Sequence, residues 1–148
     1  METIKIQRLN EKAKNFYENM YKTKGSAGFD LAYLGDEPLT IKPNEVVKIE
    51  TGLKVELSPH TYLQIHSRSG LATKNRIVVA NNVGIIDNDF RGELIVVLTN
   101  FSNEDYVVKP NDRVAQAIVM SYIRPRVDFV DELNETERGE GGFGSTGN

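Results

Sequence analysis

The sequence predicts an all-β fold, and two observations carry that prediction. β-branched residues dominate the apolar segments, as in "RIVVANNVGIID" and "GELIVVLTN", and such side chains suit the pleated surface of a strand. Turn-forming residues interrupt these segments roughly every ten residues, a spacing typical of β-barrels and β-sandwiches. The chain should therefore fold as many short strands joined by turns.

The expected strands follow one another along the chain. The first lies in the alternating segment "TIKIQRL", and the next lie in "NEVVKIETGLKVEL" after the Pro43-Asn44 turn and in "TYLQIHS" after Pro59. Later strands are expected in "RIVVANNVGIID", "GELIVVLTN", "DYVVKPN" and "RVAQAIVMSYI". Residues 81–94 are expected to form a β-hairpin with "DNDFRG" at its bend. A single helix is predicted over residues 11–21, where apolar side chains recur near helical spacing.

Length and composition describe one ordinary globular domain. The chain has 148 residues, of which 39% are hydrophobic and 26% are charged. A net charge of −3 provides no electrostatic case for a nucleic-acid or membrane partner. The N-terminus has no signal-like apolar run, no window is apolar enough for a membrane span, and there is no cysteine. We therefore expect a soluble intracellular protein, of the cytoplasm or the nucleus, with no direct nucleic-acid or membrane contact.

A change of composition after Val130 divides the chain into a domain, residues 1–130, and an arm, residues 131–148. Acidic and polar residues open the arm, and "RGEGGFGSTGN" closes it. Consecutive glycines can turn several N–H groups toward a phosphate, and Arg138 adds a guanidinium fork. Ser145 and Thr146 add hydroxyl donors, and Phe143 could cover a ring. The alternative for such a tail is a disordered, solvated segment.

Other residues could also carry chemistry. The Arg-Ser-Gly of residues 68–70 follows a predicted strand and offers anion donors, although by itself it is a common loop. Asp87 directly follows an apolar pair, and a carboxylate held near a strand end can orient and deprotonate water. Asn81 has both a donor and an acceptor for an amide-like base edge. Asp30 and Gln116, taken singly, are typical turn or strand residues.

Five segments in one order resemble the five motifs of the trimeric dUTPases, and the resemblance runs from about residue 25 to residue 147. They are "AGFDL" (27–31), "SRSGLA" (67–72), "NNVGIIDNDFRGEL" (81–94), "NDRVAQ" (111–116) and "RGEGGFGSTG" (138–147). The resemblance implies a distorted, jelly-roll-like β-barrel that forms a homotrimer with active sites at subunit interfaces. It also implies hydrolysis of dUTP to dUMP and pyrophosphate, which limits uracil in DNA and supplies dUMP. The glycine-rich arm would cross to a neighbouring subunit and close its active site.

The resemblance assigns roles to individual residues. Asp87 matches the catalytic aspartate that orients the water attacking the α-phosphorus, and Phe90 matches the aromatic residue under the deoxyribose, where many members have tyrosine. Uracil would be read by hairpin backbone and one side chain, at Gly84, Ile85, Ile86 and Asn81. The phosphates would be bound by Arg68, Ser69, Gly70 and Gln116. The arm would contribute Arg138, Phe143, Gly144, Ser145 and Thr146.

A metal ion belongs to the same resemblance. The family uses Mg²⁺ that bridges the three phosphates, mostly through water, as suits an ion that dehydrates reluctantly. Asp30 matches the aspartate near the water shell of that ion, so it would make an outer-sphere contact.

Two alternatives remain beside the dUTPase interpretation. A dCTP deaminase-like enzyme shares the fold, but it carries a catalytic glutamate where this chain has Val97, and it tends to have Arg-Ser-Ser in place of residues 68–70. A non-catalytic, nucleotide-binding regulatory trimer is the second alternative. The intact Asp87 and the complete arm argue against lost catalysis.

Overall fold

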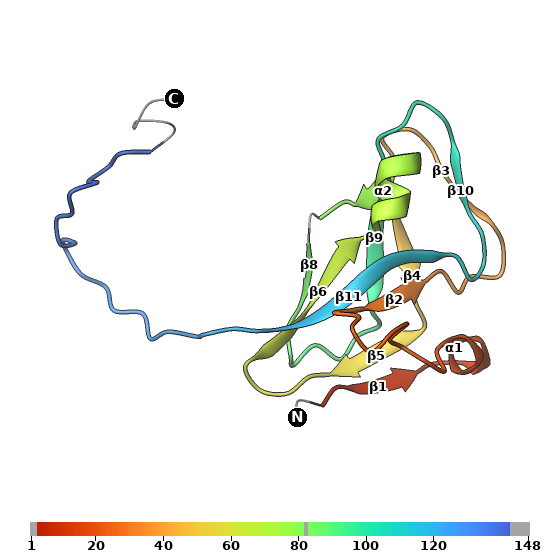
Figure 1. Ribbon diagram of the computed structural model, residues 1–148, viewed down its shortest axis with the longest axis horizontal. Helices are drawn as coiled ribbons and strands as arrows, with labels where there is room; N and C mark the ends of the chain where they lie inside the picture. The colour runs from red at the N-terminus through yellow and green to blue at the C-terminus, as the bar shows by residue number, and fades with distance from the viewer. Residues whose placement is uncertain (1–2, 82, 143–148) are drawn as a thin grey trace.

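The computed structural model describes residues 3–81 and 83–142, and within them strands predominate, which confirms the predicted all-β class (Figure 1). The elements in chain order are β1 (Lys5–Arg8), α1 (Glu11–Phe16), β2 (Phe29–Ala32), β3 (Leu39–Ile41), β4 (Val46–Glu50), β5 (Leu53–Glu56), β6 (Thr61–Ser67), α2 (Ser69–Asn75), β7 (Ile77–Val79), β8 (Gly84–Ile86), β9 (Ile95–Asn100), β10 (Tyr106–Val108) and β11 (Arg113–Ser121).

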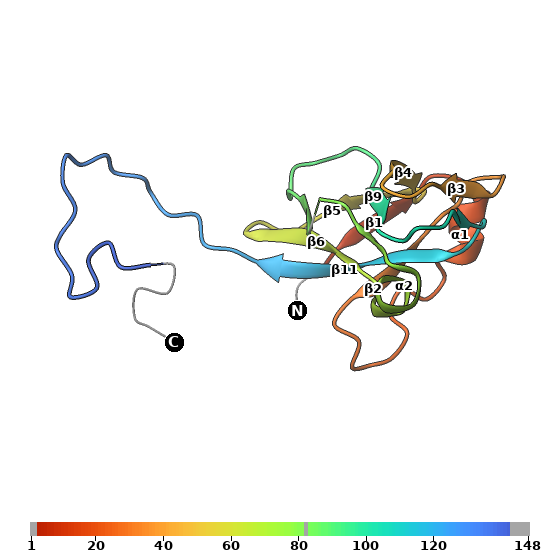
Figure 2. The ribbon, with the colours of Figure 1, turned by 90° about the horizontal axis from the view of Figure 1, so that it is seen from above.

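The strands form antiparallel sheets that wrap around one core. The largest sheet has the order β2-β11-β6-β8, and a second has the order β4-β9-β7. Two-stranded ribbons, β1-β5 and β3-β10, complete the barrel. Two views at right angles show the sheets enclosing a common interior, with α1 and α2 outside it (Figures 1 and 2).

Alternation in the sequence decides which face of each strand enters the core. In β6, Thr61, Leu63 and Ile65 are buried, whereas Tyr62, Gln64 and His66 point to the outer face and are half-buried. Successive side chains of a strand point to opposite faces, so the segment "TYLQIHS" has an apolar side and a polar side. Burying one leucine or isoleucine stabilises the fold by roughly 1.5–3 kcal/mol.

The predicted helix over residues 11–21 is wrong beyond Phe16. The helix begins correctly, because the Asn10 Oδ1 accepts a hydrogen bond from the Ala13 N–H at 2.8 Å. Tyr17 then leaves the helical region with φ −96° and ψ 59°. Its hydroxyl accepts a hydrogen bond from the Ala32 N–H at 2.9 Å, which draws the chain onto the barrel. Tertiary contact thus overrides the helical spacing.

The predicted β-hairpin over residues 81–94 is also wrong. β8 pairs with β6, with Gly84 opposite Ile65, whereas the next strand, β9, pairs with β4 and β7 in another sheet. A Cβ at Gly84 would lie only 3.1 Å from the Ile65 Cβ, so glycine permits the close approach of β8 to β6.

Three elements were not expected. Strands β2 and β3 are short, and α2 begins inside "SRSGLA", a segment interpreted as a loop. The Thr73 hydroxyl donates to the Ser69 carbonyl at 2.7 Å, and Arg76 ends the helix with a left-handed φ of 58°. None of the residues of α2 is buried, so no apolar periodicity marks this helix in the sequence.

Asn100, at the end of β9, is a fully buried polar residue that joins three segments. Its Nδ2 donates to the Ile41 carbonyl at 2.9 Å and to the Glu104 carbonyl at 2.7 Å. Its Oδ1 accepts from the Ser102 N–H at 2.8 Å and from the Ser102 hydroxyl at 2.7 Å. The amide therefore uses its full hydrogen-bonding capacity inside the protein.

After β11, residues 122–142 form neither helix nor strand and are mostly exposed. This segment runs away from the barrel in both views (Figures 1 and 2). Across the described residues, no helix combines the length and the apolar content needed to cross a membrane.

Replacing Asn100 should show how much its hydrogen bonds contribute to the free energy of unfolding. Asn100→Ala leaves buried backbone groups without partners, and we expect the free energy of unfolding to fall by about 2–4 kcal/mol. Urea denaturation measures the change. Asn103→Ala, in the same turn but exposed, is the matched control and should shift stability by less than about 0.5 kcal/mol. Equal effects of the two substitutions would contradict the role given to the Asn100 amide.

Candidate active site

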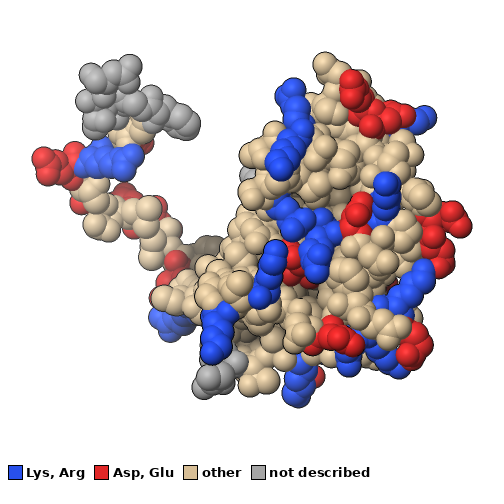
Figure 3. All heavy atoms as spheres, turned by 45° about the vertical axis from the view of Figure 1, so that its right-hand side comes forward, with Lys and Arg blue, Asp and Glu red and all other residues tan. Residues whose placement is uncertain are grey.

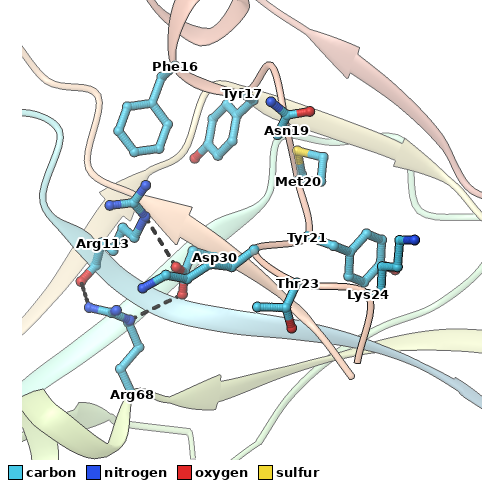
Figure 4. A pocket seen from close by; sticks show the side chains of 11 residues that line it. Phe16, Tyr17, Asn19, Met20, Tyr21, Thr23, Lys24, Asp30, Arg68 and Arg113 are labelled. Atoms are coloured by element: carbon cyan, nitrogen blue, oxygen red, sulfur yellow. Dashed lines mark hydrogen bonds and ion pairs between the residues drawn. The ribbon is translucent and has the colours of Figure 1, made fainter. Parts of the chain in front are cut away.

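Two guanidinium groups share one half-buried carboxylate on the outer face of the large sheet (Figure 4). The Asp30 Oδ1 lies 3.2 Å from the Arg68 Nε, and the Asp30 Oδ2 lies 3.1 Å from the Arg113 Nε. The Arg68 Nη1 also donates to the Arg113 carbonyl at 3.1 Å. The group holds two positive charges against one negative charge, so its net charge is positive.

The strand register assembles this group from distant parts of the chain. β11 lies between β2 and β6, with Gln116 opposite both Asp30 and His66. Side chains of directly opposed residues lie on the same face of an antiparallel pair. The predicted phosphate ligands Arg68 and Gln116 are therefore brought to one end of the sheet together with Asp30. Ser69 and Gly70 follow at once in α2.

A cavity of about 670 Å³ opens beside this group. Its lining adds Lys22 and Lys24 to the two arginines, and aromatic rings cover one side (Figure 4). The Arg113 guanidinium lies over the Phe16 ring at 5.4 Å from the centroid, a cation–π contact. In the space-filling view, basic groups gather with acidic ones near the middle of the barrel (Figure 3). Four cations facing one carboxylate suit the binding of an anion.

Asp87 lies in a second cavity, of about 530 Å³, whose lining includes Tyr62, Ile85, Asp89 and Arg124. Asp87 directly follows β8 and is exposed to solvent. Its carbonyl accepts a hydrogen bond from the Phe90 N–H at 3.2 Å, which shapes the turn after the strand.

The predicted uracil-reading residues lie next to Asp87 along the chain and close to one another. A Cβ at Gly84 would lie 3.3 Å from the Asn81 Nδ2, so the Asn81 side chain lies against the Gly84 backbone. Val83 has a φ of 83°, which is rare for a β-branched residue and marks backbone strain. The Phe90 ring is exposed and folds back over Gly92. A Cβ added at Gly92 would lie only 2.4 Å from that ring.

Asp87 with its neighbours and the basic group with Arg68 lie at opposite ends of β6. Leu63 pairs with Ile86, so the chain reaches Asp87 at the Tyr62 end, whereas Arg68 follows the other end. Arg68 lies six positions after Tyr62 in the chain, which corresponds to about 20 Å at roughly 3.3 Å per residue. Within one chain, Asp87 and Arg68 are therefore too far apart to act on the same phosphate.

Of the predicted arm residues, Arg138 is described, and its Nε donates to the Gly141 carbonyl at 2.8 Å. Phe143, Gly144, Ser145 and Thr146 lie outside the described residues. Arg138 is exposed and lies on the segment that leaves the barrel (Figure 1).

The structure adds three residues that the motif comparison left out. Arg113 shares the carboxylate of Asp30, and Tyr62 and Arg124 line the cavity of Asp87. Arg113 lies inside "NDRVAQ", so the motif itself marks it as a candidate site residue. Tyr62 and Arg124 lie outside every motif, and only the pairing of β6 with β8 and β11 brings them near Asp87.

Comparison with known proteins gives a consistent family. A sequence model of the dUTPase family matches residues 14–147. The deoxyuridine 5'-triphosphate nucleotidohydrolase of Treponema denticola is 51% identical over 127 residues, which cover 86% of this chain and 88% of that protein. Its counterpart in Nautilia profundicola is 46% identical over 144 residues, 97% of this chain and 98% of that one. A point variant of the Staphylococcus bacteriophage 80alpha dUTPase with dUpNHpp has the same fold, with a TM-score of 0.83 at 23% identity over 98% of each chain.

Tyr17, which lines the basic cavity, should make the fold sensitive to alkaline pH. Burial raises the pKa of its hydroxyl to about 12, against opposing effects of the Ala32 hydrogen bond and Arg113. Below pH 10 the Tyr17 side chain is neutral in the folded and in the unfolded chain, so its full contribution to the free energy of unfolding is present. From pH 10 to 12 the unfolded chain ionises first, so the free energy of unfolding falls by about 1.4 kcal/mol per pH unit.

Urea denaturation between pH 8 and pH 11.5 tests this expectation. Tyr17→Phe should be less stable below pH 10, because the Ala32 N–H loses its partner. It should lack the additional alkaline slope, so its difference from the wild type should shrink above pH 10. Tyr21→Phe removes a half-exposed hydroxyl and should keep the wild-type slope. If Tyr17→Phe follows the same slope as the wild type, another group causes the alkaline loss.

Proposed function

This chain belongs to the dUTPase family and hydrolyses dUTP to dUMP and pyrophosphate, and we propose that Asp87 directs the water that attacks the α-phosphorus. The observation that carries this assignment is the exposed Asp87 carboxylate that lines a cavity directly after the strand that would read the base. Among the described residues, no ion pair engages Asp87. Its carboxylate is therefore available to accept a proton or a hydrogen bond from water.

The geometry of β8 supports its role as the uracil-reading element. β8 is the edge strand of the large sheet, so one side of its backbone has no partner strand among the described residues. An edge strand presents N–H and C=O groups in alternation, and uracil needs both an acceptor and a donor at its pairing edge. The amide of Asn81 lies against Gly84 and adds a further donor and acceptor. A ligand that left these polar groups unpaired, such as a cytosine nucleotide, would bind far more weakly.

The basic group at the other end of the sheet supports phosphate binding. Arg68 is held in place by Asp30 and by the Arg113 carbonyl, so its guanidinium is preorganised. A Cβ at Gly70 would have no heavy atom within 4 Å, which leaves the backbone there open to a ligand. Cations placed before the reaction stabilise negative charge that develops on the departing pyrophosphate.

A shared active site follows from the distance between the two groups. A triphosphate cannot reach both Asp87 and Arg68 of one chain across about 20 Å, because Arg68 lies six positions along the chain from Tyr62, the neighbour of Asp87. We infer that Asp87 of one copy faces Arg68 of another, in a homotrimer. The arm, residues 131–148, would leave the domain, residues 1–130, and close the site of a neighbouring copy. The direction in which residues 122–142 leave the barrel suits such an exchange.

Magnesium requires a separate test against the residues present. No group of three or more His, Cys, Asp or Glu side chains that could hold a metal ion occurs in residues 3–81 and 83–142. Both oxygens of Asp30 are held by guanidinium groups, so the described residues do not fit an inner-sphere site. Mg²⁺ would therefore be bound mainly by the triphosphate and its own waters, where it neutralises phosphate charge. A water-mediated contact with Asp30 stays a prediction.

The deaminase alternative finds no support in the barrel. Val97 is an apolar residue within β9, opposite Lys48 of β4, and its carbonyl accepts from the Ala80 N–H at 2.8 Å. A deaminase needs an acid–base group at that position, and valine has none.

Asp87→Asn should separate binding from hydrolysis. The amide keeps the size of the side chain but cannot take a proton, so we expect kcat to fall by about 10²–10⁴-fold with dUTP affinity nearly unchanged. Pyrophosphate release measures turnover, and equilibrium binding of dUpNHpp measures affinity. Asp105→Asn, an exposed change on the loop before β10, serves as the control. Near-normal turnover of Asp87→Asn would remove Asp87 from the mechanism.

Deleting residues 138–148 should leave a folded trimer that hydrolyses dUTP poorly. The deleted segment supplies Arg138 and the glycine-rich donors expected to close over the triphosphate, so kcat/KM should fall by at least about tenfold, the loss of one or more charged hydrogen bonds. Sedimentation measures the assembly, and pyrophosphate release measures the activity. Dissociation into monomers would show instead that the arm holds the trimer together.

A further inference from the structure

We propose that Tyr62 is a positioning residue for the water-directing Asp87, and that Gln64 and His66 set the direction in which its hydroxyl donates. The inference rests on the proposed role of Asp87. It concerns three residues of β6 that no motif of the family resemblance includes. They lie on the outer face of the strand, from Tyr62, which lines the cavity of Asp87, to His66, which stands opposite Gln116.

The three side chains are joined by two hydrogen bonds. The Gln64 Nε2 donates to the Tyr62 hydroxyl oxygen at 2.6 Å. The Gln64 Oε1 lies 2.8 Å from the His66 Nε2. Alternate residues of a strand share a face, so the segment "TYLQIHS" places these groups in one line along β6.

With its amide nitrogen toward Tyr62 and its amide oxygen toward His66, Gln64 gives this row of hydrogen bonds one direction. An amide oxygen can only accept, so the His66 Nε2 must carry a proton and donate to Gln64. An amide nitrogen can only donate, so the Tyr62 oxygen must be an acceptor in its bond with Gln64. The single proton of the Tyr62 hydroxyl is then free to be donated elsewhere. Among the described residues, that hydroxyl donates to no protein acceptor.

Neighbouring side chains hold the row of Tyr62, Gln64 and His66 in place. Ile118 on β11 and Ile85 on β8 stand opposite Gln64 on its two sides. Apolar neighbours limit access of water to the amide, and a hydrogen bond is stronger where water is excluded. The Tyr62 ring also meets the Tyr122 ring edge-on, with centroids 6.0 Å apart. The Tyr122 N–H donates to the His60 carbonyl at 2.9 Å, which anchors that contact.

The cavity that holds Asp87 offers a carboxylate acceptor for the unused proton of Tyr62. Tyr62 and Asp87 line the same cavity, and the register Leu63–Ile86 brings them next to each other at the ends of neighbouring strands. A hydroxyl that donates to a carboxylate forms a charge-assisted hydrogen bond. Tyr62 would hold one oxygen of Asp87, which leaves the other oxygen directed at water. Such a residue affects kcat and has little influence on substrate binding.

The experiment compares variants of the full-length protein for pyrophosphate release from dUTP and for dUpNHpp affinity. Tyr62→Phe removes the proton and should lower kcat by about tenfold, the order of one oriented hydrogen bond, with KM and dUpNHpp affinity within about twofold. Tyr33→Phe is the matched control, because its hydroxyl donates to the Glu37 carbonyl on another part of the barrel. It should keep the wild-type kcat.

Gln64→Glu tests the direction of the line. A carboxylate at position 64 would accept the Tyr62 proton, which turns the hydroxyl away from Asp87. We expect a kcat as low as that of Tyr62→Phe. Because Gln64 acts through Tyr62, the double variant should be no slower than Tyr62→Phe alone.

Three results would overturn the proposal: a wild-type kcat in Tyr62→Phe, a rise in KM without a fall in kcat, or multiplicative losses in the double variant. Thermal denaturation of each variant identifies any loss that comes from unfolding. Failure of the role of Asp87 would be visible separately, as normal turnover in Asp87→Asn. If Asp87→Asn is inactive and Tyr62→Phe is normal, Asp87 directs water without help from Tyr62.

Discussion

The antiparallel register of β11 against β2 and β6 is the constraint on which the rest of the site depends. β11 has nine residues and pairs with both neighbours, which brings Asp30, Gln116 and His66 into one row. Because side chains alternate between faces, a slip of one residue would move Gln116 into the core and expose Ala115 or Ala117. The buried alanines and the outer glutamine thus specify one register. The end of the sheet to which we assign phosphate binding follows from that register.

The arginines at this end are held in place within the chain before any ligand arrives. Asp30 is paired with two guanidinium groups, so neither arginine needs a counter-ion from solvent to hold its position. The cavity lining still has more positive than negative charge, because Lys22 and Lys24 add to the two arginines. This arrangement suits a polyanionic substrate, while the chain as a whole carries a net charge of −3. Local placement of cations, and not overall charge, therefore decides the ligand class.

The two ends of β6 present different chemical groups. One end presents cations, to which we assign the phosphates, and the other presents an edge strand and an exposed carboxylate, to which we assign the base and the water. A single barrel holds both ends but cannot bring them to one nucleotide. In the proposed homotrimer, association of identical copies would solve this geometric problem, since each copy would offer one end to a neighbour. The polar line of Tyr62, Gln64 and His66 runs between the two ends on the outer face.

The sequence by itself determined the class of fold and most of the candidate chemistry. Local alternation in "TYLQIHS" is enough to predict β6 to the residue, and motif resemblance is enough to select Asp87 and Arg68. The tertiary structure decided what depends on distant partners. Tyr17 ends α1 early because its hydroxyl bonds with Ala32, and β8 joins β6 because Gly84 allows close approach. Arg113 and Tyr62 gain their roles only through strand pairing. These outcomes rest on contacts between residues far apart in the chain, which local propensity and spacing do not record.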